Sequence, residues 1–343
     1  MYSEIRYYAP SFLIFLVAYR VATSSSSWKQ FNRNVVLISA LIALNGLLIL
    51  ISITLDIDFH GDETGEIDRA VGLYSNANRA GYVSCLGQAS SLYMVMTRVR
   101  NRRYIFMGFY VICMVAALST FSKGAATVTL FILSVFLFNS FSSPEMMRQK
   151  VVKRSINFLL LGLVLIAGYA LLNINQIIAG FTAEQAQRSE ELIQFYHGEI
   201  NQATTTNRSE LWQYALEQIS DSPILGFGLG EFHVMDIGVG VHNIYLLLWG
   251  EAGILALLAY VIFLITWFKG SFKVREPSVR FYLRNVLLVV FLSGFAAHTL
   301  LVNKSYMIVL GVLIGGFAVD KHHIKLDRIK RYMQSKSEST QEE

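Results

Sequence analysis

Charge is scarce in this sequence. Of its 343 residues only 15% are Asp, Glu, Lys or Arg, whereas about a quarter are charged in a typical soluble domain. Hydrophobic residues make up 54%, and the mean hydropathy is +0.45. Because so little charge cannot cover a surface that faces water, the composition excludes an ordinary soluble domain and predicts a polytopic membrane protein.

Cysteine is nearly absent as well, since only Cys85 and Cys113 occur. Both lie inside apolar runs and far apart, which excludes a disulfide framework and indicates packing residues. A cleavable signal peptide is not indicated either, because Met1 to Pro10 carries little positive charge and no small-residue cleavage pattern follows the first apolar run. We expect that run to remain as an anchor.

Apolar stretches near the length of about 20 residues that crosses a bilayer recur along the chain. They predict an all-α polytopic integral membrane protein with about nine transmembrane helices and one large, partly helical periplasmic loop. Glycines at Gly250–Gly253 and Gly311–Gly316 fall inside two stretches, as membrane helices tolerate. The stretches are Tyr8–Thr23, Val35–Leu55, Ala77–Met96, Tyr104–Ser119, Ala125–Phe141, Ile156–Leu172, Ile244–Phe268, Tyr282–Ala297 and Ser305–Ala318.

Basic residues favour the cytoplasmic side of a membrane, and here they alternate with acidic loops. This bias predicts N-terminal transmembrane helices over 1–172, a large periplasmic loop over 173–242, C-terminal transmembrane helices over 243–319 and a basic cytoplasmic tail over 320–343. The pI near 9.1 then reflects sidedness, with no need for a nucleic-acid partner.

The predicted topology leaves few cations outside: Arg6, Arg69, Arg79, Lys123, Arg188, Arg208 and Lys304. Most of them stand beside a short polar motif. In the first motif, RAVGLYSNANRAG, Asn76 or Asn78 is suited to start a helix, which predicts Arg79 in the first turn, where free N–H groups favour an anion. A capped helix with a snorkelling arginine explains the same pattern.

The second motif, LSTFSKGAATV, predicts a tight external turn with Lys123 at the membrane surface, although a lone turn lysine is usually just solvated. In the third, NRSELW, Arg208 opens an amphipathic helix, where it either meets an anion or pairs with Glu210 or another loop acid. The following DSPILGFGLGEF has G-x-G-x-G spacing without a preceding strand or a Walker lysine, which excludes a nucleotide-binding loop. Its glycines predict a loop backbone that passes closely over the protein.

The last motif, HNIYLLLWGEAG, begins an apolar helix with His242 and Asn243. A histidine at the outer mouth of a helix, opposite basic loops, is a candidate general base near neutral pH, although a lone histidine is usually structural. Glu251 is either a buried acid bonded to a neighbouring helix or a catalytic group.

The ordered motifs together resemble the O-antigen ligase and polymerase superfamily of bacterial envelope enzymes. The resemblance spans Arg69 to Gly253 and consists of R-x-x-G-L-Y-x-N-x-N, a turn with S-K-G, N-R-x-x-x-W before D-S-P-I-L-G-x-G-x-G, and H-N-x-Y-L-x-x-x-x-E-x-G. It implies an inner-membrane, multi-pass glycosyltransferase with a periplasmic active face. Such an enzyme moves a glycan from undecaprenyl diphosphate to lipid A core or a growing glycan, among membrane lipids, without metal or other cofactor.

The resemblance also implies roles for individual residues. His242 would accept the proton of the attacking hydroxyl, and Arg208 would stabilise the leaving diphosphate. Substrate-binding roles would fall to Arg69, Asn78, Arg79, Lys123, Asn243 and Tyr245. The chain departs from the family in carrying Lys123 where arginine is more common, and in having about two helices before the first motif, fewer than is usual.

Two alternatives to a ligase remain at this stage. A polymerase shares the same motifs and differs in its acceptor. A non-enzymatic transporter of the lipid-linked saccharide would bind the same diphosphate, but no internal repeat and no broken midplane helix is apparent in the sequence.

Overall fold

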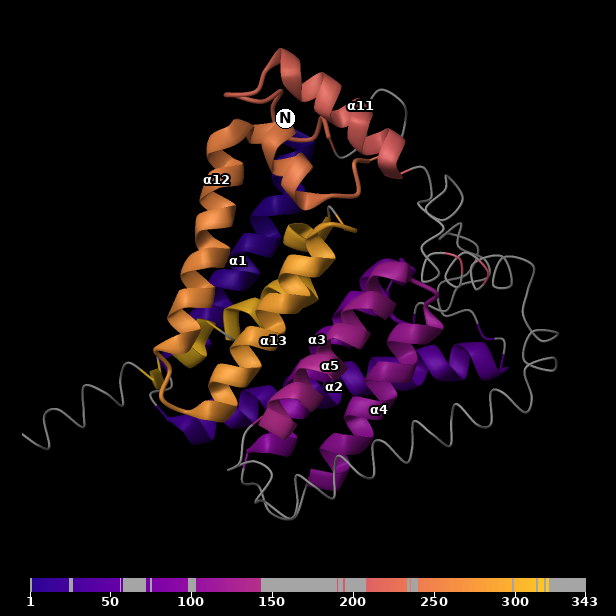
Figure 1. Ribbon diagram of the computed structural model, residues 1–343, viewed down its shortest axis with the longest axis vertical. Coiled ribbons are helices and arrows are strands. Elements are labelled where there is room, and N and C mark those ends of the chain that lie inside the picture. The colour runs from indigo at the N-terminus through magenta and orange to yellow at the C-terminus, as the bar shows by residue number, and fades with distance from the viewer. Residues whose placement is uncertain are drawn as a thin grey trace, which may run out of the picture.

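The structure, a computed structural model, has helices as its only regular elements in the part of the chain that it describes (Figure 1). It describes residues 2–24, 27–55, 57, 72–74, 76–97, 103–142, 190, 194, 208–232, 235, 240–297, 299–312, 314–317 and 319–320. Arg69, Arg188 and the predicted span Ile156–Leu172 lie outside these residues.

Most predicted apolar stretches correspond to a helix. The N-terminal part contains α1 (Tyr2–Ser24), α2 (Trp28–Leu55), α3 (Ala77–Met96), α4 (Arg103–Ser119) and α5 (Lys123–Ser142). The C-terminal part contains α11 (Arg208–Asp221), α12 (Ile244–Phe272), α13 (Pro277–Gly294), the 3-10 turn η2 (Thr299–Val302) and a last described helix, Lys304–Phe317. The predicted boundaries of α3 are confirmed at both ends, whereas α2 and α13 begin earlier than predicted.

Two described helices, Trp28–Leu55 and Ile244–Phe272, are long and apolar enough to cross a membrane. The other apolar helices fall below that length, namely Tyr8–Thr23, Arg103–Ser119, Lys123–Phe138 and Lys304–Phe317. The described residues therefore agree with an all-helical membrane protein, while the predicted number of nine spans is not confirmed.

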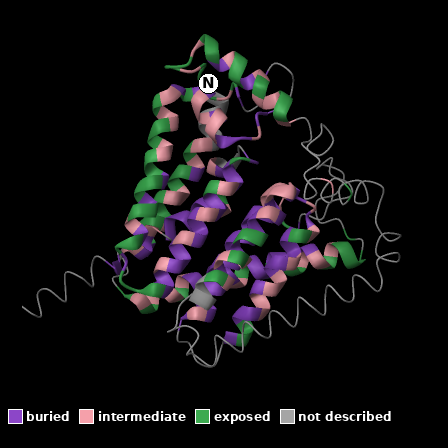
Figure 2. Ribbon diagram, viewed as in Figure 1, coloured by how far each residue is buried: buried purple, intermediate pink, exposed green. Residues whose placement is uncertain are grey.

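Helix α3 lies at the centre of a bundle with α2, α4, α5 and α13, and nearly all of its residues are buried (Figure 2). Small residues let its neighbours approach. A side chain at Gly87 would meet Ile42 of α2 at 2.5 Å and Cys113 of α4 at 2.7 Å. Inside the bundle, the Gln88 amide donates a hydrogen bond to the Thr129 hydroxyl over 2.9 Å.

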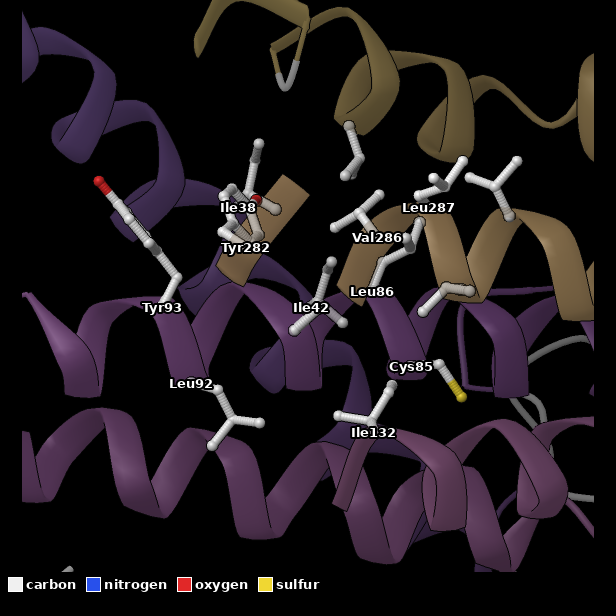
Figure 3. Packing of buried hydrophobic residues seen from close by; sticks show 14 of the residues in the cluster. Ile38, Ile42, Cys85, Leu86, Leu92, Tyr93, Ile132, Tyr282, Val286 and Leu287 are labelled. Carbon is white, nitrogen blue, oxygen red and sulfur yellow. The ribbon is translucent and has the colours of Figure 1, made fainter. Parts of the chain in front are cut away.

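Apolar and aromatic side chains fill the space between these helices (Figure 3). The rings of Tyr93 on α3 and Tyr282 on α13 stack 4.8 Å apart. The Tyr282 hydroxyl lies 2.9 Å from the Ser90 hydroxyl. Cys85 and Cys113 are buried and form no disulfide, which confirms that they are packing residues.

Helix α1 packs against the last described helix through small residues on both sides. A side chain at Gly311 would approach Ala18 to 2.7 Å, and one at Gly315 would collide with Ala22. The four-residue spacing on each helix gives the close backbone approach typical of membrane helix pairs. The prediction that glycines near 311–316 lie inside a helix is thus confirmed.

Helix α12 is interrupted at Gly253, which corrects the prediction of one continuous span from Ile244 to Phe268. Gly253 has φ 76° and ψ −179°, a backbone conformation open essentially to glycine alone. A continuous helix would hold Tyr245 and Tyr260 about 22 Å apart along its axis, whereas their ring centroids are 5.7 Å apart. The chain therefore folds back on itself, so that residues 244–252 form a first limb and residues 254–272 a second limb.

The glycine-rich loop after α11 docks on this turn. The Phe227 N–H donates to the Gly250 carbonyl over 2.8 Å, and the Gly228 N–H donates to the Glu251 carbonyl over 2.9 Å. Carbonyls that the interrupted helix leaves open are thereby satisfied. A side chain at Gly226 would approach the Glu251 carbonyl to 2.7 Å, which confirms the predicted close passage of the loop backbone.

The loop, α11 and the first limb share a small apolar cluster of their own, separate from the bundle core. Its buried members are Ala215, Ile219, Phe232, Met235, Val241 and Leu247. We call residues 208–252 the cap. The cap lies over one end of the structure, above the second limb (Figure 1).

Candidate functional site

The start of α3 places Arg79 where the sequence predicted. The Asn76 side chain accepts hydrogen bonds from the N–H groups of Asn78 at 3.0 Å and Arg79 at 3.2 Å, so Asn76 is the N-cap. Arg79 lies in the first turn, and Gly81 follows within van der Waals distance of the turn between α4 and α5. We call this end of the bundle the site end.

Lys123 lies at the same end, as the first residue of α5. The Ser122 hydroxyl accepts a hydrogen bond from the Ala125 N–H over 3.4 Å, which starts the helix. A side chain at Gly81 would approach Ala125 to 2.6 Å, so α3 and α5 begin side by side. The predicted tight turn before Lys123 is confirmed.

The end of α13 joins this group of helix starts. A side chain at Gly124 would approach Ala296, just after α13, to 3.1 Å. On its other side, α13 contacts the first limb of α12: a side chain at Gly294 would approach the Tyr245 ring to 3.0 Å. The first limb therefore begins at the site end, beside α13.

Asn243 and Tyr245 fix the start of that limb. The buried Asn243 side chain accepts hydrogen bonds from the N–H groups of Tyr245 at 2.9 Å and Leu246 at 3.3 Å. The Tyr245 hydroxyl donates to the Phe291 carbonyl over 2.9 Å, and its ring packs 4.7 Å from that of Phe295. Both residues therefore orient the chain at His242, in addition to any contact with substrate.

His242 directly precedes this N-cap and is half-buried. Its φ of 48° is in the left-handed region, which turns the chain sharply into the limb. The pKa of His242 is lowered from its ordinary value, first because burial penalises the imidazolium and then because Arg208 repels the same charge. At neutral pH the ring is therefore uncharged and able to accept a proton.

Arg208 is the first residue of α11, and its effect on His242 shows that the two lie near each other. The alternative that Arg208 pairs with Glu210 or another loop acid stays a prediction, because most of the loop acids lie outside the described residues. The apolar face of α11, with Ala215 and Ile219 buried, rests on the cap cluster and holds the helix in place.

Glu251 has a defined structural position. Its carboxylate is buried, and it accepts hydrogen bonds from the Gly230 N–H over 3.0 Å and the Tyr8 hydroxyl over 3.1 Å. One side chain thus joins the loop, α12 and α1. Of the two alternatives for Glu251, the bonded buried acid is the one that the structure confirms.

Lys304 is a cation at the site end to which sequence reasoning assigned no role. It is exposed and opens the last described helix, which Asn303 caps through a hydrogen bond from the Tyr306 N–H of 3.1 Å. The next residue, Ser305, lies within hydrogen-bonding reach of Tyr74, just before α3. The signal available in the sequence was an Asn-Lys pair before an apolar run.

The site end therefore gathers most of the predicted residues from distant parts of the sequence. They are Asn78, Arg79, Lys123, Arg208, His242, Asn243 and Tyr245, whereas Arg69 lies outside the described residues. Among the residues that the structure describes, no group of three His, Cys, Asp or Glu side chains is arranged to hold a metal ion.

A model of the O-antigen ligase family matches residues 70–261, more than half of the chain. The chain belongs to the O-antigen ligase family. As a member of it, the chain is a bacterial membrane protein of the ligase and polymerase kind, with a glycosyltransferase-like function in polysaccharide synthesis. The matched region contains Arg79, Lys123, Arg208 and His242, while Arg69 and Lys304 fall outside it.

A solved structure with a similar arrangement comes from work on the structural coordination of polymerization and crosslinking by a peptidoglycan synthase complex. The identity is 14% and the TM-score is 0.48, over 94% of this chain and 90% of that chain. No curated protein matches the chain.

Proposed function

We propose that this O-antigen ligase family member transfers a glycan from undecaprenyl diphosphate to an acceptor on the periplasmic face of the bacterial inner membrane. The favoured acceptor is lipid A core, which makes the chain an O-antigen ligase that works without metal. In the same proposal, residues 1–172 and 243–319 form the membrane part, 173–242 the periplasmic loop and 320–343 the cytoplasmic tail.

The observation that carries the proposal is the half-buried His242, whose pKa is lowered by burial and then by Arg208, at the end of the bundle where Arg79 and Lys123 lie in the first turns of α3 and α5. A general base must be deprotonated before it acts, and a diphosphate needs positive charge around it. Both requirements are met by residues that far-separated helices bring to one end.

In the proposed reaction, His242 accepts the proton of the acceptor hydroxyl. At the same time the hydroxyl oxygen forms a bond to the anomeric carbon of the donor sugar. The bond from that carbon to the diphosphate oxygen breaks, and undecaprenyl diphosphate leaves with the electron pair. Arg208, with Arg79 and Lys123, stabilises the charge on the leaving oxygen. The proton on His242 passes to water afterwards.

The interrupted α12 is a specific observation in favour of the transporter alternative, because transporters place broken helices around their substrate. Here, however, the open carbonyls of Gly250 and Glu251 are already bonded to loop N–H groups. The break therefore offers little backbone to a transported ion or sugar, and the transferase remains the better-supported function.

The test uses the purified full chain in proteoliposomes with an undecaprenyl-diphosphate-linked glycan and lipid A core. We expect His242→Ala to lower product formation by about 100-fold or more, and Arg208→Ala to do so by a similar factor. Arg208→Lys should lose less, because it keeps the charge without the bidentate fork. Gln213→Ala, at an exposed position of α11, is the matched control and should leave the rate unchanged.

Normal product formation by both His242→Ala and Arg208→Ala would contradict the proposed mechanism. The acceptor separates the two enzyme classes, since a polymerase gives a ladder from donor alone and a ligase needs lipid A core. Movement of intact donor across the bilayer without any new glycosidic bond would instead establish a transporter.

A further inference from the structure

The loop that docks on the α12 turn carries an exposed apolar tip. From Ser222 to Gly230 it has no charged residue. Its four large side chains are exposed, with exposed fractions of 64% for Ile224, 80% for Leu225, 45% for Phe227 and 42% for Leu229, and the Phe227 ring also packs 6.1 Å from that of Phe232. A contiguous apolar patch of this kind in a non-helical segment marks a binding or membrane surface.

The tip is held rigidly. Besides the bonds at Gly250 and Glu251, the Ile254 N–H donates to the Pro223 carbonyl over 3.0 Å. The Trp249 indole N–H donates to that same carbonyl over 3.0 Å. The apolar side chains are thus presented at one fixed place, directly beside the start of the second limb.

The second limb indicates the depth of that place in the bilayer. From Lys269 back to Gly253 the helix rises about 24 Å, and the hydrocarbon layer is about 30 Å thick. With Lys269 at the cytoplasmic boundary of the hydrocarbon layer, the α12 turn at Gly253 therefore lies just inside the periplasmic boundary of that layer. The exposed apolar residues of the second limb begin directly after the turn with Leu255, which is 67% exposed, and continue through Leu258 and Ile262 (Figure 2). The tip therefore extends the lipid-facing surface of this limb.

Trp249 gives a second, independent indication of depth. Tryptophan is enriched where the hydrocarbon meets the headgroups, because its ring is apolar and its N–H needs a partner. Here the ring is partly exposed and its N–H is bonded to the base of the tip. The tip therefore lies at the level of the outer interface.

We propose that the tip of residues 224–229 inserts into the outer leaflet, where the acyl chains of membrane lipids cover it. The tip then anchors the cap and keeps Arg208 level with the membrane surface, where a lipid-linked diphosphate lies. The inference rests on the topology used in the proposed function, with the site end outside.

The experiment measures membrane depth directly. Cys85 and Cys113 are replaced by alanine, and a single cysteine at Leu225 is labelled with bimane in proteoliposomes of the full chain. We expect lipids brominated near the headgroup end of the acyl chain to quench this label several-fold more than one at Gln213→Cys on α11. A membrane-impermeant maleimide should correspondingly react several-fold faster at position 213.

Equal quenching at the two positions, or equal reaction with the maleimide, would overturn the proposal. Quenching that appears only after a long-chain polyprenyl diphosphate is added would also overturn it, because the tip would then bind the donor's own chain. Since neither readout requires transfer, loss of activity in the His242 tests and loss of quenching here can be told apart.

Discussion

The bundle and the cap are stabilised by different interactions. In the bundle, α3 packs against its neighbours through small residues and a large apolar core of side-chain contacts. In the cap, main-chain hydrogen bonds and glycine close approaches connect the loop to the α12 turn, around a much smaller apolar cluster. The bundle core should therefore tolerate the loss of a methyl group better than the cap tolerates an added side chain at its turn.

The strongest test of this contrast is Gly253→Ala. Alanine at φ 76° is strained, and its side chain would collide with the Ile224 carbonyl. We expect the free energy of unfolding of the cap to fall by about 3 kcal/mol or more, with transfer activity largely lost. Hydrogen exchange over residues 222–254 measures the loss. Gly108→Ala on α4, whose added side chain meets nothing within 4 Å, should change neither quantity.

A smaller effect is expected where one side chain connects the two regions. Glu251→Ala removes the acceptor for the Gly230 N–H and the Tyr8 hydroxyl, and should cost about 2 to 4 kcal/mol. Tyr8→Phe removes only the second bond and should cost about 2 kcal/mol. Hydrogen exchange should show the Tyr8 effect in α1 and the Glu251 effect in both α1 and the loop. Identical exchange patterns would show that Glu251 does not act as the common partner.

In the bundle, Ile132→Val should have a modest effect. Ile132 is fully buried on α5, and the loss of one methyl group should lower stability by about 0.5 to 1.5 kcal/mol. Transfer activity should be unchanged, because the helix starts that carry Arg79 and Lys123 do not move. A loss of activity as large as that of Gly253→Ala would remove the proposed difference between the two regions.

The mildest effect concerns pH. His242 acts as a base when neutral, so activity falls as pH drops through its pKa, which burial and then Arg208 hold below the ordinary value. Arg208→Gln removes the second cause, so the pKa rises and the acid limb of the residual kcat/KM profile moves to higher pH. An unchanged or lower midpoint would show that Arg208 does not act on the histidine.

The sequence allowed the helix starts to be predicted because their signals are local. Asn76 before an apolar run marked α3, and the turn in LSTFSKGAATV put Lys123 just before the apolar stretch of α5, so both cations were placed at the correct helix starts. The turn in α12 could not be predicted this way. Gly253 stands in an apolar run, where glycine is ordinary in a membrane helix, and its partner Ile224 lies in a loop upstream.

Side-chain roles at the site were harder to predict than positions. Asn243 was assigned to substrate, yet its oxygen is bonded to two backbone N–H groups of its own helix. Lys304 was assigned no role because the position of its helix beside α3, seen in the contact of Ser305 with Tyr74, depends on tertiary packing between distant segments. The gathering of cations at one end became visible only once the helices were packed.

The position of α1 has a consequence for the order of assembly. It is made well before its partners, because it packs on Gly311 and Gly315, and its Tyr8 donates a hydrogen bond to Glu251, 243 residues later. At about 5 to 20 residues per second, α1 waits roughly 12 to 60 seconds for these partners. Until then its own hydropathy and its contacts with α2 hold it in the bilayer, so the native packing of α1 is completed only by residues 251–315.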